Sequence, residues 1–205
     1  MLVEESGLRI LTDPGMYTVE AHTQVSNIDV ILITHEHQDH LHIESLKTIL
    51  TNNPSAQIVT NTDVAAIITA GNIATSVHVV DNSNQISIKG VVLESIGNDH
   101  APIYPPIIAS VQNTGYIIAN HFFYPGDALT IPAKPIEVLA LPIAGPWLKI
   151  SEAVDYAKTV NPKTCFPVHD GGLTMTIPYH RTAERVLGLT DIKFQILELG
   201  VENQL

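Results

Sequence analysis

Three histidines and one aspartate lie within six positions of each other in the run HEHQDH, as His35, His37, Asp39 and His40. On an extended or loop backbone, His35 and His37 point to the same side and can bind one metal ion. Asp39 and His40 follow on the turn and can reach a second ion. Nitrogen-rich ligand sets with carboxylate oxygens favour Zn²⁺, with Mn²⁺ or iron as alternatives. The competing interpretation is a polar loop that holds histidines by chance, but composition alone seldom produces this spacing.

Further candidate ligands also follow apolar segments. Residues 29–34, DVILIT, form a continuous apolar run with β-branched residues, which is typical of a strand buried on both faces and leads directly into His35. His100, Asp127 and His169 each come soon after another expected strand. Side chains that follow neighbouring strands converge on one rim of a sheet. We therefore expect one shared site.

The elements that must position these side chains are short strands mixed with a few helices. A hairpin is expected at residues 3–11, turning at Ser6-Gly7. Further strands are expected at 57–60, 76–80, 85–89, 91–96, 106–112, 116–123, 137–141, 164–168 and 193–199. Helices are expected at 43–50, 62–70, 151–160 and 179–187, the second capped by Asn61 or Thr62 and the third by Ser151. No linker divides the chain, which predicts one α/β domain over residues 1–205.

The composition argues against several classes of partner. A net charge of -11, with only ten unclustered lysines and arginines, disfavours nucleic acids, whose phosphates require cationic side chains. The apolar runs are too short to span a membrane, and the first residues lack the features of a signal peptide. The single Cys165 agrees with a reducing compartment. We therefore expect a cytoplasmic protein that acts on a small molecule.

The ordered set of motifs resembles the pattern of the metallo-β-lactamase superfamily. The run from His35 to His40 after a buried strand ending in Thr34 is similar to the signature of that family. The other elements of the pattern occur in the expected order across residues 2–170, as Asp13-Pro14, Asn98-Asp99-His100, Gly126-Asp127 and Phe166-Pro167-Val168-His169. Together these elements are much more specific than the first motif alone.

This resemblance implies a fold, a ligand set and a mechanism. The fold would be a four-layer αββα sandwich that contains a two-metal site. His35, His37 and His100 would bind one ion. Asp39, His40 and His169 would bind the other, with Asp127 between the two ions. Asp39 would also be the catalytic residue that orients a metal-activated hydroxide.

The details of the pattern distinguish between branches of the superfamily. The commonest zinc β-lactamases carry a cysteine where this chain has Asp127, and no histidine at position 40. The chain most resembles the small lactonase-like branch that includes L-ascorbate-6-phosphate lactonase. Members of this branch usually begin with a further strand and a Gly-His-Ser-like turn, so the resemblance implies a shortened N-terminus. The first sheet would then have an edge that is open or covered by a second copy of the chain.

Two classes of function remain open. The first is a hydrolase that acts on a small ester, lactone or phosphoester. The second is a non-catalytic metal-binding or sensing protein of the same fold. The presence of both Asp39 and Asp127 favours the hydrolase, because a binding protein has little need for either carboxylate.

Other residues near these motifs have less specific signals. Asp13 is either an acceptor that orients a ligand histidine or a turn residue before Pro14. Trp147 and Lys149 either form part of a substrate wall or are a hydrophobic anchor and a solvated lysine. The other histidines are expected to have structural or surface roles, and they are His22, His42, His78, His121 and His180.

Overall fold

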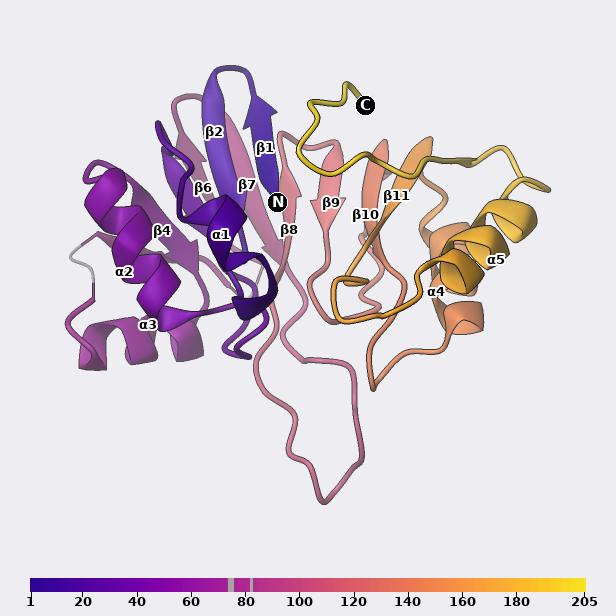
Figure 1. The fold of residues 1–205 in the computed structure, drawn as a ribbon, viewed down its shortest axis with the longest axis horizontal. Coiled ribbons are helices and arrows are strands. Elements are labelled where there is room, and N and C mark those ends of the chain that lie inside the picture. Colours follow the sequence, from indigo (N-terminus) through magenta and orange to yellow (C-terminus); the bar gives the residue numbers. More distant parts are fainter. Residues whose placement is uncertain (74–75, 82) are drawn as a thin grey trace.

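A computed structural model describes residues 1–73, 76–81 and 83–205, and within them two β-sheets face each other (Figure 1). The first sheet has the strand order β1-β2-β3-β4-β5 and the second has the order β12-β11-β10-β9-β8-β7-β6. The first contains β1 (Leu2–Glu5), β2 (Leu8–Thr12), β3 (Val30–Leu32), β4 (Gln57–Thr60) and β5 (Val77–Val79). The second contains β6 (Gln85–Ile88), β7 (Val91–Ile96), β8 (Gly115–Ile118), β9 (Phe122–Tyr124), β10 (Val138–Pro142), β11 (Thr164–Val168) and β12 (Lys193–Phe194).

Helices cover the outer face of each sheet (Figure 1). The short η1 (Met16–Thr18) and α1 (Val19–His22), with α2 (Ile43–Asn52) and α3 (Thr62–Ala70), belong to the first half. The second sheet is covered by α4 (Ile150–Val160) and α5 (Ile177–Leu187). None of the helices within the described residues is long and apolar enough to cross a membrane.

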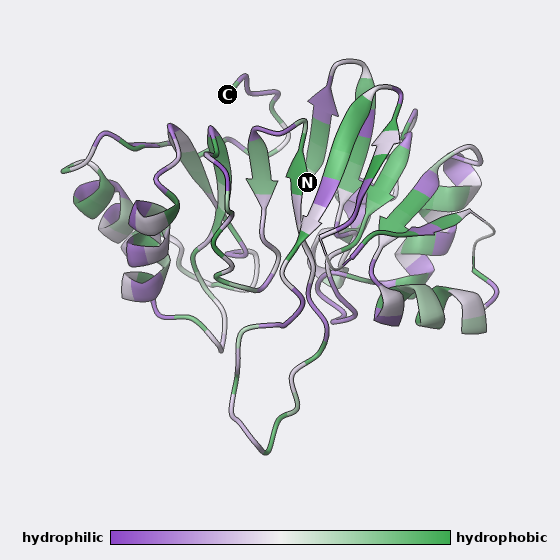
Figure 2. Cartoon of the chain, turned by 180° about the vertical axis from the view of Figure 1, so that it is seen from behind, coloured by the Kyte–Doolittle hydropathy of each residue, from purple (hydrophilic) through white to green (hydrophobic). Residues whose placement is uncertain are grey.

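Three hydrophobic clusters match the four layers. The cluster between the sheets includes Ile10 from the first sheet and Tyr116 from the second. A second cluster joins the first sheet to α2 and α3, and a third joins the second sheet to α4 and α5. Most strands are hydrophobic, whereas the helices carry hydrophilic patches (Figure 2). In β3, Val30 and Leu32 face the central cluster while Ile31 faces the helices, which explains its continuous apolar sequence.

The strand directions bring the candidate ligands to one rim. β2 to β5 are parallel to each other, and so are β9, β10 and β11. β7 runs parallel to β9 because β8 is antiparallel to both. The carboxyl ends of these strands therefore meet at the same rim, where Asp13, His35, His100, Asp127 and His169 follow them.

Several expected elements differ in the structure. The strand expected at 116–123 is two strands, β8 and β9, joined by a turn in which Ala119 and Asn120 have positive φ angles. The segment 106–112 is part of a long loop, with Ile107 and Ile108 exposed and a single bridge between Asp99 and Gln112. Apolar composition alone predicted a strand there, but within the described residues the segment pairs only through the bridge at Gln112.

The ends of three other elements also differ. The strand expected at 193–199 ends at Phe194, because only two residue pairs of β12 align with β11. Helix α4 begins at Ile150 with Lys149 as its N-cap, so Ser151 does not cap it. The Lys149 amide instead donates to the Glu152 carboxylate. Helix α5 begins at Ile177, two residues before the expected Tyr179.

Candidate metal centre

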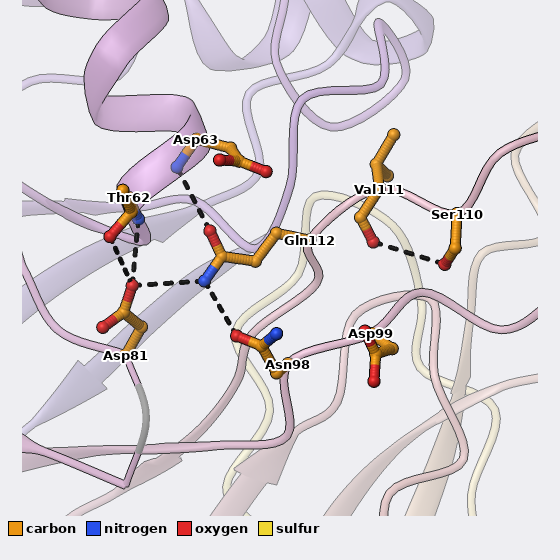
Figure 3. Close-up of a pocket in the computed structure, with 8 residues that line it drawn as sticks. All are labelled: Thr62, Asp63, Asp81, Asn98, Asp99, Ser110, Val111 and Gln112. Atoms are coloured by element: carbon orange, nitrogen blue, oxygen red, sulfur yellow. Dashed lines mark hydrogen bonds between the residues drawn. The ribbon is translucent and has the colours of Figure 1, made fainter.

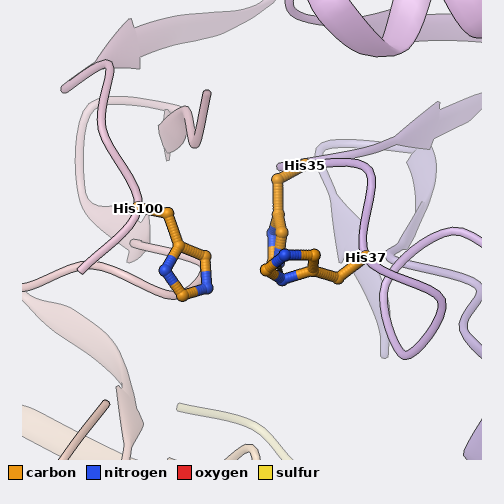
Figure 4. A group of neighbouring side chains, drawn as sticks. All are labelled: His35, His37 and His100. Atoms are coloured by element: carbon orange, nitrogen blue, oxygen red, sulfur yellow. Dashed lines mark hydrogen bonds between the residues drawn. The ribbon is translucent and has the colours of Figure 1, made fainter. Parts of the chain in front are cut away.

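His35, His37 and His100 form the first group of candidate ligands. Their ligand atoms lie within 4.8 Å of one another. His35 and His37 come from the loop after β3, and His100 faces them from the connection between β7 and β8 (Figure 4). The ring centroid of His100 lies 5.1 Å from that of His35 and 4.8 Å from that of His37. The expected alternation of His35 and His37 therefore brings both rings to the same place.

Asp39, His40 and His169 form a second group with the same spacing. The Nε2 atom of His169 lies 3.4 Å from Asp39 Oδ2. Asp127 lies between the groups, since its Oδ1 is 3.1 Å from His40 Nε2 and its Oδ2 is 3.4 Å from His100 Nε2. Its Oδ2 is also 3.1 Å from His169 Nε2. All seven candidate ligands inferred from the sequence thus lie together.

In three of the candidate ligand histidines, the Nδ1 atom faces away from the centre and is held by a hydrogen bond. His100 Nδ1 donates to the Ala101 carbonyl and His169 Nδ1 to the Ala144 carbonyl, each at 2.6 Å. His40 Nδ1 donates to Asp13 Oδ2 at 2.6 Å. Each ring therefore presents Nε2 to the centre, as is usual for metal-binding histidines.

Asp13 is more than a turn residue before Pro14. Its Oδ2 also accepts from the hydroxyls of Thr34 and Tyr124, each at 2.7 Å, and its backbone has a φ of 41°. Burial raises the pKa of Asp13, but the charge of His40 and these hydrogen bonds outweigh burial and lower it. The carboxylate is therefore ionised and fixes the orientation of His40. Tyr124 was not identified from the sequence, because its contact with Asp13 joins residues far apart in the chain.

The two groups differ in their electrostatics. Burial lowers the pKa of His35 to about 3, and it lowers the pKa of His37 as well. Burial also opposes protonation of His40, but Asp13 and Asp127 outweigh it and raise its pKa to about 10. The carboxylates of Asp127 and Asp39, 3.1 and 3.4 Å from its Nε2 atom, likewise outweigh burial and raise the pKa of His169 to about 10. Without metal, His35 and His37 are therefore neutral, while His40 and His169 hold protons.

Neither Trp147 nor Lys149 lines the cavity described below, and Trp147 instead contacts a candidate ligand. Trp147 is only 8% exposed, and its Nε1 donates to Asp127 Oδ2 at 2.9 Å. Its ring also packs edge-on against His100 and His169, with centroid distances of 5.8 and 6.1 Å. The Lys149 side chain is 81% exposed and lies 3.8 Å from Glu152. The structure corresponds to the alternative of a buried anchor and a solvated lysine, with the added contact to Asp127.

A cavity of about 440 Å³ opens beside the second group. Asp39, His40, Asp127 and His169 form its polar part. Tyr17, Leu173 and Tyr179 line it from the segments around η1 and α5. None of these three was identified from the sequence, because no motif surrounds them. The cavity provides space for a small molecule next to the candidate ligands.

A separate hollow of about 400 Å³ lies around the ends of the long loop (Figure 3). There Gln112 donates to Asp81 and Asn98 and accepts from the backbone amide of Asp63. These bonds tie the loop that carries His100 to the start of α3. We therefore interpret this hollow as structural.

The remaining histidines have local partners away from the centre. His42 contacts Ser45, and His121 contacts Glu5. His180 lies 2.7 Å from Asp170, the residue after His169. His22 contacts Thr18 and His78 contacts Gln57. None of these five belongs to the candidate ligand groups found among the described residues.

Comparison with known proteins agrees with this architecture. The family model described as "Beta-lactamase superfamily domain" matches residues 1–169. Protein Rv0786c of Mycobacterium tuberculosis is 34% identical over 205 residues, covering 96% of this chain and 92% of the relative.

Solved structures show the same fold. A protein named as a metal-dependent hydrolase of Parabacteroides distasonis matches with a TM-score of 0.73 and 23% identity, covering 97% of this chain and 88% of the other. The metallo-β-lactamase fold protein YhfI of Bacillus subtilis matches with a TM-score of 0.72 and 13% identity, covering 98% of this chain and 88% of the other. The two-sheet arrangement is therefore the metallo-β-lactamase fold.

Proposed function

Because the chain belongs to the family of β-lactamase superfamily domains, we propose that it is a hydrolase that uses two metal ions to cleave a small ester, lactone or phosphoester. The observation that carries this proposal is the convergence of five histidines and two aspartates beside an open cavity. The cavity favours a hydrolase over a sensing protein, because it gives a small molecule access to the candidate ligands.

The chemistry of the centre fits metal ions. At the centre, Nε2 of His40, His100 and His169 and Oδ1 of Asp127 are buried without a hydrogen bond of normal geometry within the described residues, although Asp127 oxygens lie 3.1 to 3.4 Å from the three nitrogens. Burying such atoms without partners is unfavourable unless a ligand satisfies them. All four face the centre and are nitrogen or carboxylate donors, which Zn²⁺ prefers and which also suit Mn²⁺ or iron.

In the proposed assignment, each metal ion has its own set of protein ligands. His35, His37 and His100 would hold one ion. Asp39, His40 and His169 would hold the other, and Asp127 would contact both. Asp13 and Trp147 would not bind metal, but they hold His40 and Asp127 in place.

When bound, two divalent cations lower the pKa of a shared water and polarise the carbonyl or phosphoryl oxygen of the substrate. Asp39 is half-buried at the cavity, where it can accept a hydrogen bond from the attacking water. The nearby His169 ring lowers the pKa of Asp39 to about 2, which keeps this carboxylate ionised at neutral pH. The loops around the cavity bind the substrate and limit the access of bulk water.

Removal of metal tests the function directly. The purified protein should hydrolyse at least one member of a panel of esters, lactones and phosphodiesters. Dialysis against a chelator should lower that rate by at least about 10³-fold, because the nucleophile and the polarising charge are both lost. Zn²⁺, Mn²⁺ or Fe²⁺ should restore it. A protein that binds two ions per chain but hydrolyses no member of the panel would be a metal-binding or sensing protein instead.

Replacing Trp147 by phenylalanine should weaken metal binding by about 10- to 100-fold, the usual effect of losing a partner behind a metal ligand. The phenyl ring can still pack against His100 and His169, whereas Asp127 Oδ2 loses its donor. Isothermal titration calorimetry measures the effect. The matched control is Tyr156→Phe, which removes a hydrogen bond to the Thr130 carbonyl away from the centre. Equal affinities in the two variants would contradict this role of Trp147.

A further inference from the structure

The cavity beside the second ligand group has an uneven lining. Its polar side chains are concentrated at the candidate metal centre. Away from the centre, the lining consists mainly of tyrosine, small and apolar residues, among them Tyr17, Pro146, Val168, Gly171, Gly172, Leu173 and Tyr179, and it also includes Thr12 and Thr18. A Cβ placed on Gly172 would lie 3.8 Å from the ring of Tyr17, so the segments that carry these residues approach each other closely. The wall is therefore built from two different parts of the chain.

No lysine or arginine side chain lines this cavity in the part of the chain that the structure describes. Two cationic residues, Lys149 and Arg181, lie close in the sequence to residues of the lining, but both face solvent. The Lys149 side chain is 81% exposed beside Glu152, and Arg181 is exposed on α5. Proteins usually bind a carboxylate or phosphate group with such side chains or with free backbone amides. The outer part of the cavity lacks the cationic side chains.

Several donors near the cavity already have acceptors within the chain. The amides of Tyr179 and His180 at the start of α5 both donate to the Thr176 carbonyl. The amino group of Met1, which also lines the cavity, donates to the Thr12 carbonyl, and burial lowers its pKa. An anionic group placed here would lose hydration without gaining a lysine or arginine partner, which is unfavourable.

We infer that the substrate is a neutral ester or lactone whose alkyl or aryl part lies against Tyr17, Leu173 and Tyr179, with no phosphate or carboxylate group away from the reacting carbonyl. This inference rests on the proposed hydrolase function and narrows its substrate class. It follows from the apolar outer lining together with the absence of cationic side chains from that lining. Burial of hydrocarbon against this wall supplies the binding energy.

Two esters with the same leaving group test the inference. p-Nitrophenyl butyrate carries a neutral acyl chain, and mono-p-nitrophenyl succinate carries an anionic one of similar length. After subtraction of uncatalysed hydrolysis, the metal-loaded protein should show at least about tenfold higher kcat/KM for the butyrate, equivalent to one anionic contact left unmade. An equal or higher value for the succinate would overturn the inference.

A charge introduced into the wall should reverse this preference. Leu173→Lys should shift the kcat/KM ratio toward the succinate by about tenfold or more, because it supplies the missing cation. Leu189→Lys is the matched control, since Leu189 is 86% exposed and does not line the cavity. Saturation-transfer NMR with butyranilide and succinanilic acid on the metal-free protein gives a readout that is independent of catalysis. An unchanged preference in Leu173→Lys would contradict the proposed wall.

The outcome separates this inference from the function on which it rests. Hydrolysis of bis(p-nitrophenyl) phosphate but of neither ester would support the proposed hydrolase function and would overturn the inference of a neutral ester or lactone substrate. Hydrolysis of no compound by the metal-loaded protein would overturn the proposed function itself. Faster hydrolysis of the butyrate, lost on chelation, would support both.

Discussion

Asp127→Ala is expected to lower kcat/KM by at least about 10³-fold and to reduce bound metal from two ions per chain to one or none. Asp127 is 3% exposed and contacts Nε2 of His40, His100 and His169, so it reaches members of both ligand groups. Replacing Asp127 removes the negative charge that lies between the two proposed metal sites, each of which would hold a divalent cation. The remaining histidines would also repel each other when protonated.

The position of Asp127 is fixed by its backbone as well as by Trp147. Its amide donates to Asn113 Oδ1 at 2.9 Å, and the preceding Gly126 has a φ of 64°. A Cβ on Gly126 would lie 2.4 Å from that same Asn113 oxygen. These contacts hold the turn in place independently of the Asp127 side chain, so the backbone should keep its course in the variant.

Three measurements make this prediction decisive. Metal content by mass spectrometry and kcat/KM should both fall, while circular dichroism should retain the signal of the folded protein. Asp127→Asn keeps the size of the side chain and tests whether the charge alone is responsible. Asp155→Ala is the control, because the Asp155 side chain is exposed on α4 and pairs with Lys158 away from the centre. Two bound ions and full activity in a folded Asp127→Ala would contradict the bridging role.

The candidate ligands could be predicted from the sequence because the signal for each is local. His35, His100 and His169 each follow an apolar strand, and parallel strands bring such positions to one rim. The HEHQDH run adds a spacing that an extended backbone converts directly into proximity. The fold could be predicted from local patterns of the same kind. β3, for example, is apolar on both faces because it packs between the central cluster and the helices α2 and α3.

The residues that surround the centre could not be predicted in the same way. Trp147 reaches Asp127 across 20 positions and Tyr124 reaches Asp13 across 111 positions. Such contacts depend on how separate loops pack after the sheets have formed, and no pattern around either residue encodes them. The turn at Ala119 and Asn120 was missed because the segment remains apolar on both sides of it. The positions of the strands were thus easier to predict than the contacts between their loops.

Metal loading is expected to depend on pH differently at the two sites. His35 and His37 have lowered pKa values, about 3 for His35, so in the metal-free protein they carry no proton that an ion must displace at neutral pH. His40 and His169 have pKa values raised to about 10, so each holds a proton that must leave. Near pH 6 the protein should therefore bind about one ion strongly.

The second ion should bind more tightly as the pH rises. Below about pH 10, each displaced proton contributes up to about tenfold in affinity per pH unit. Calorimetric titration from pH 6 to pH 9, in buffers with different ionisation enthalpies, counts the protons released with each ion. About two should accompany the second ion, from His40 and His169, whereas His35 and His37 should release none with the first. His78→Asn, at a histidine that contacts Gln57 instead of the centre, should leave both counts unchanged. Identical proton release for the two ions would contradict the assignment.

The same protons affect the stability of the metal-free protein. The folded-state pKa of His40 lies above its ordinary value, so its protonation stabilises the folded chain most below about pH 6.5, and this contribution is lost as the pH rises toward about 10. Metal binding strengthens in the opposite direction. Chelated protein should therefore lose thermal stability from pH 7 to pH 9, while the metal-loaded protein should lose less over the same range. A proton at low pH and a metal ion at high pH would then satisfy the same buried nitrogen, the Nε2 atom of His40.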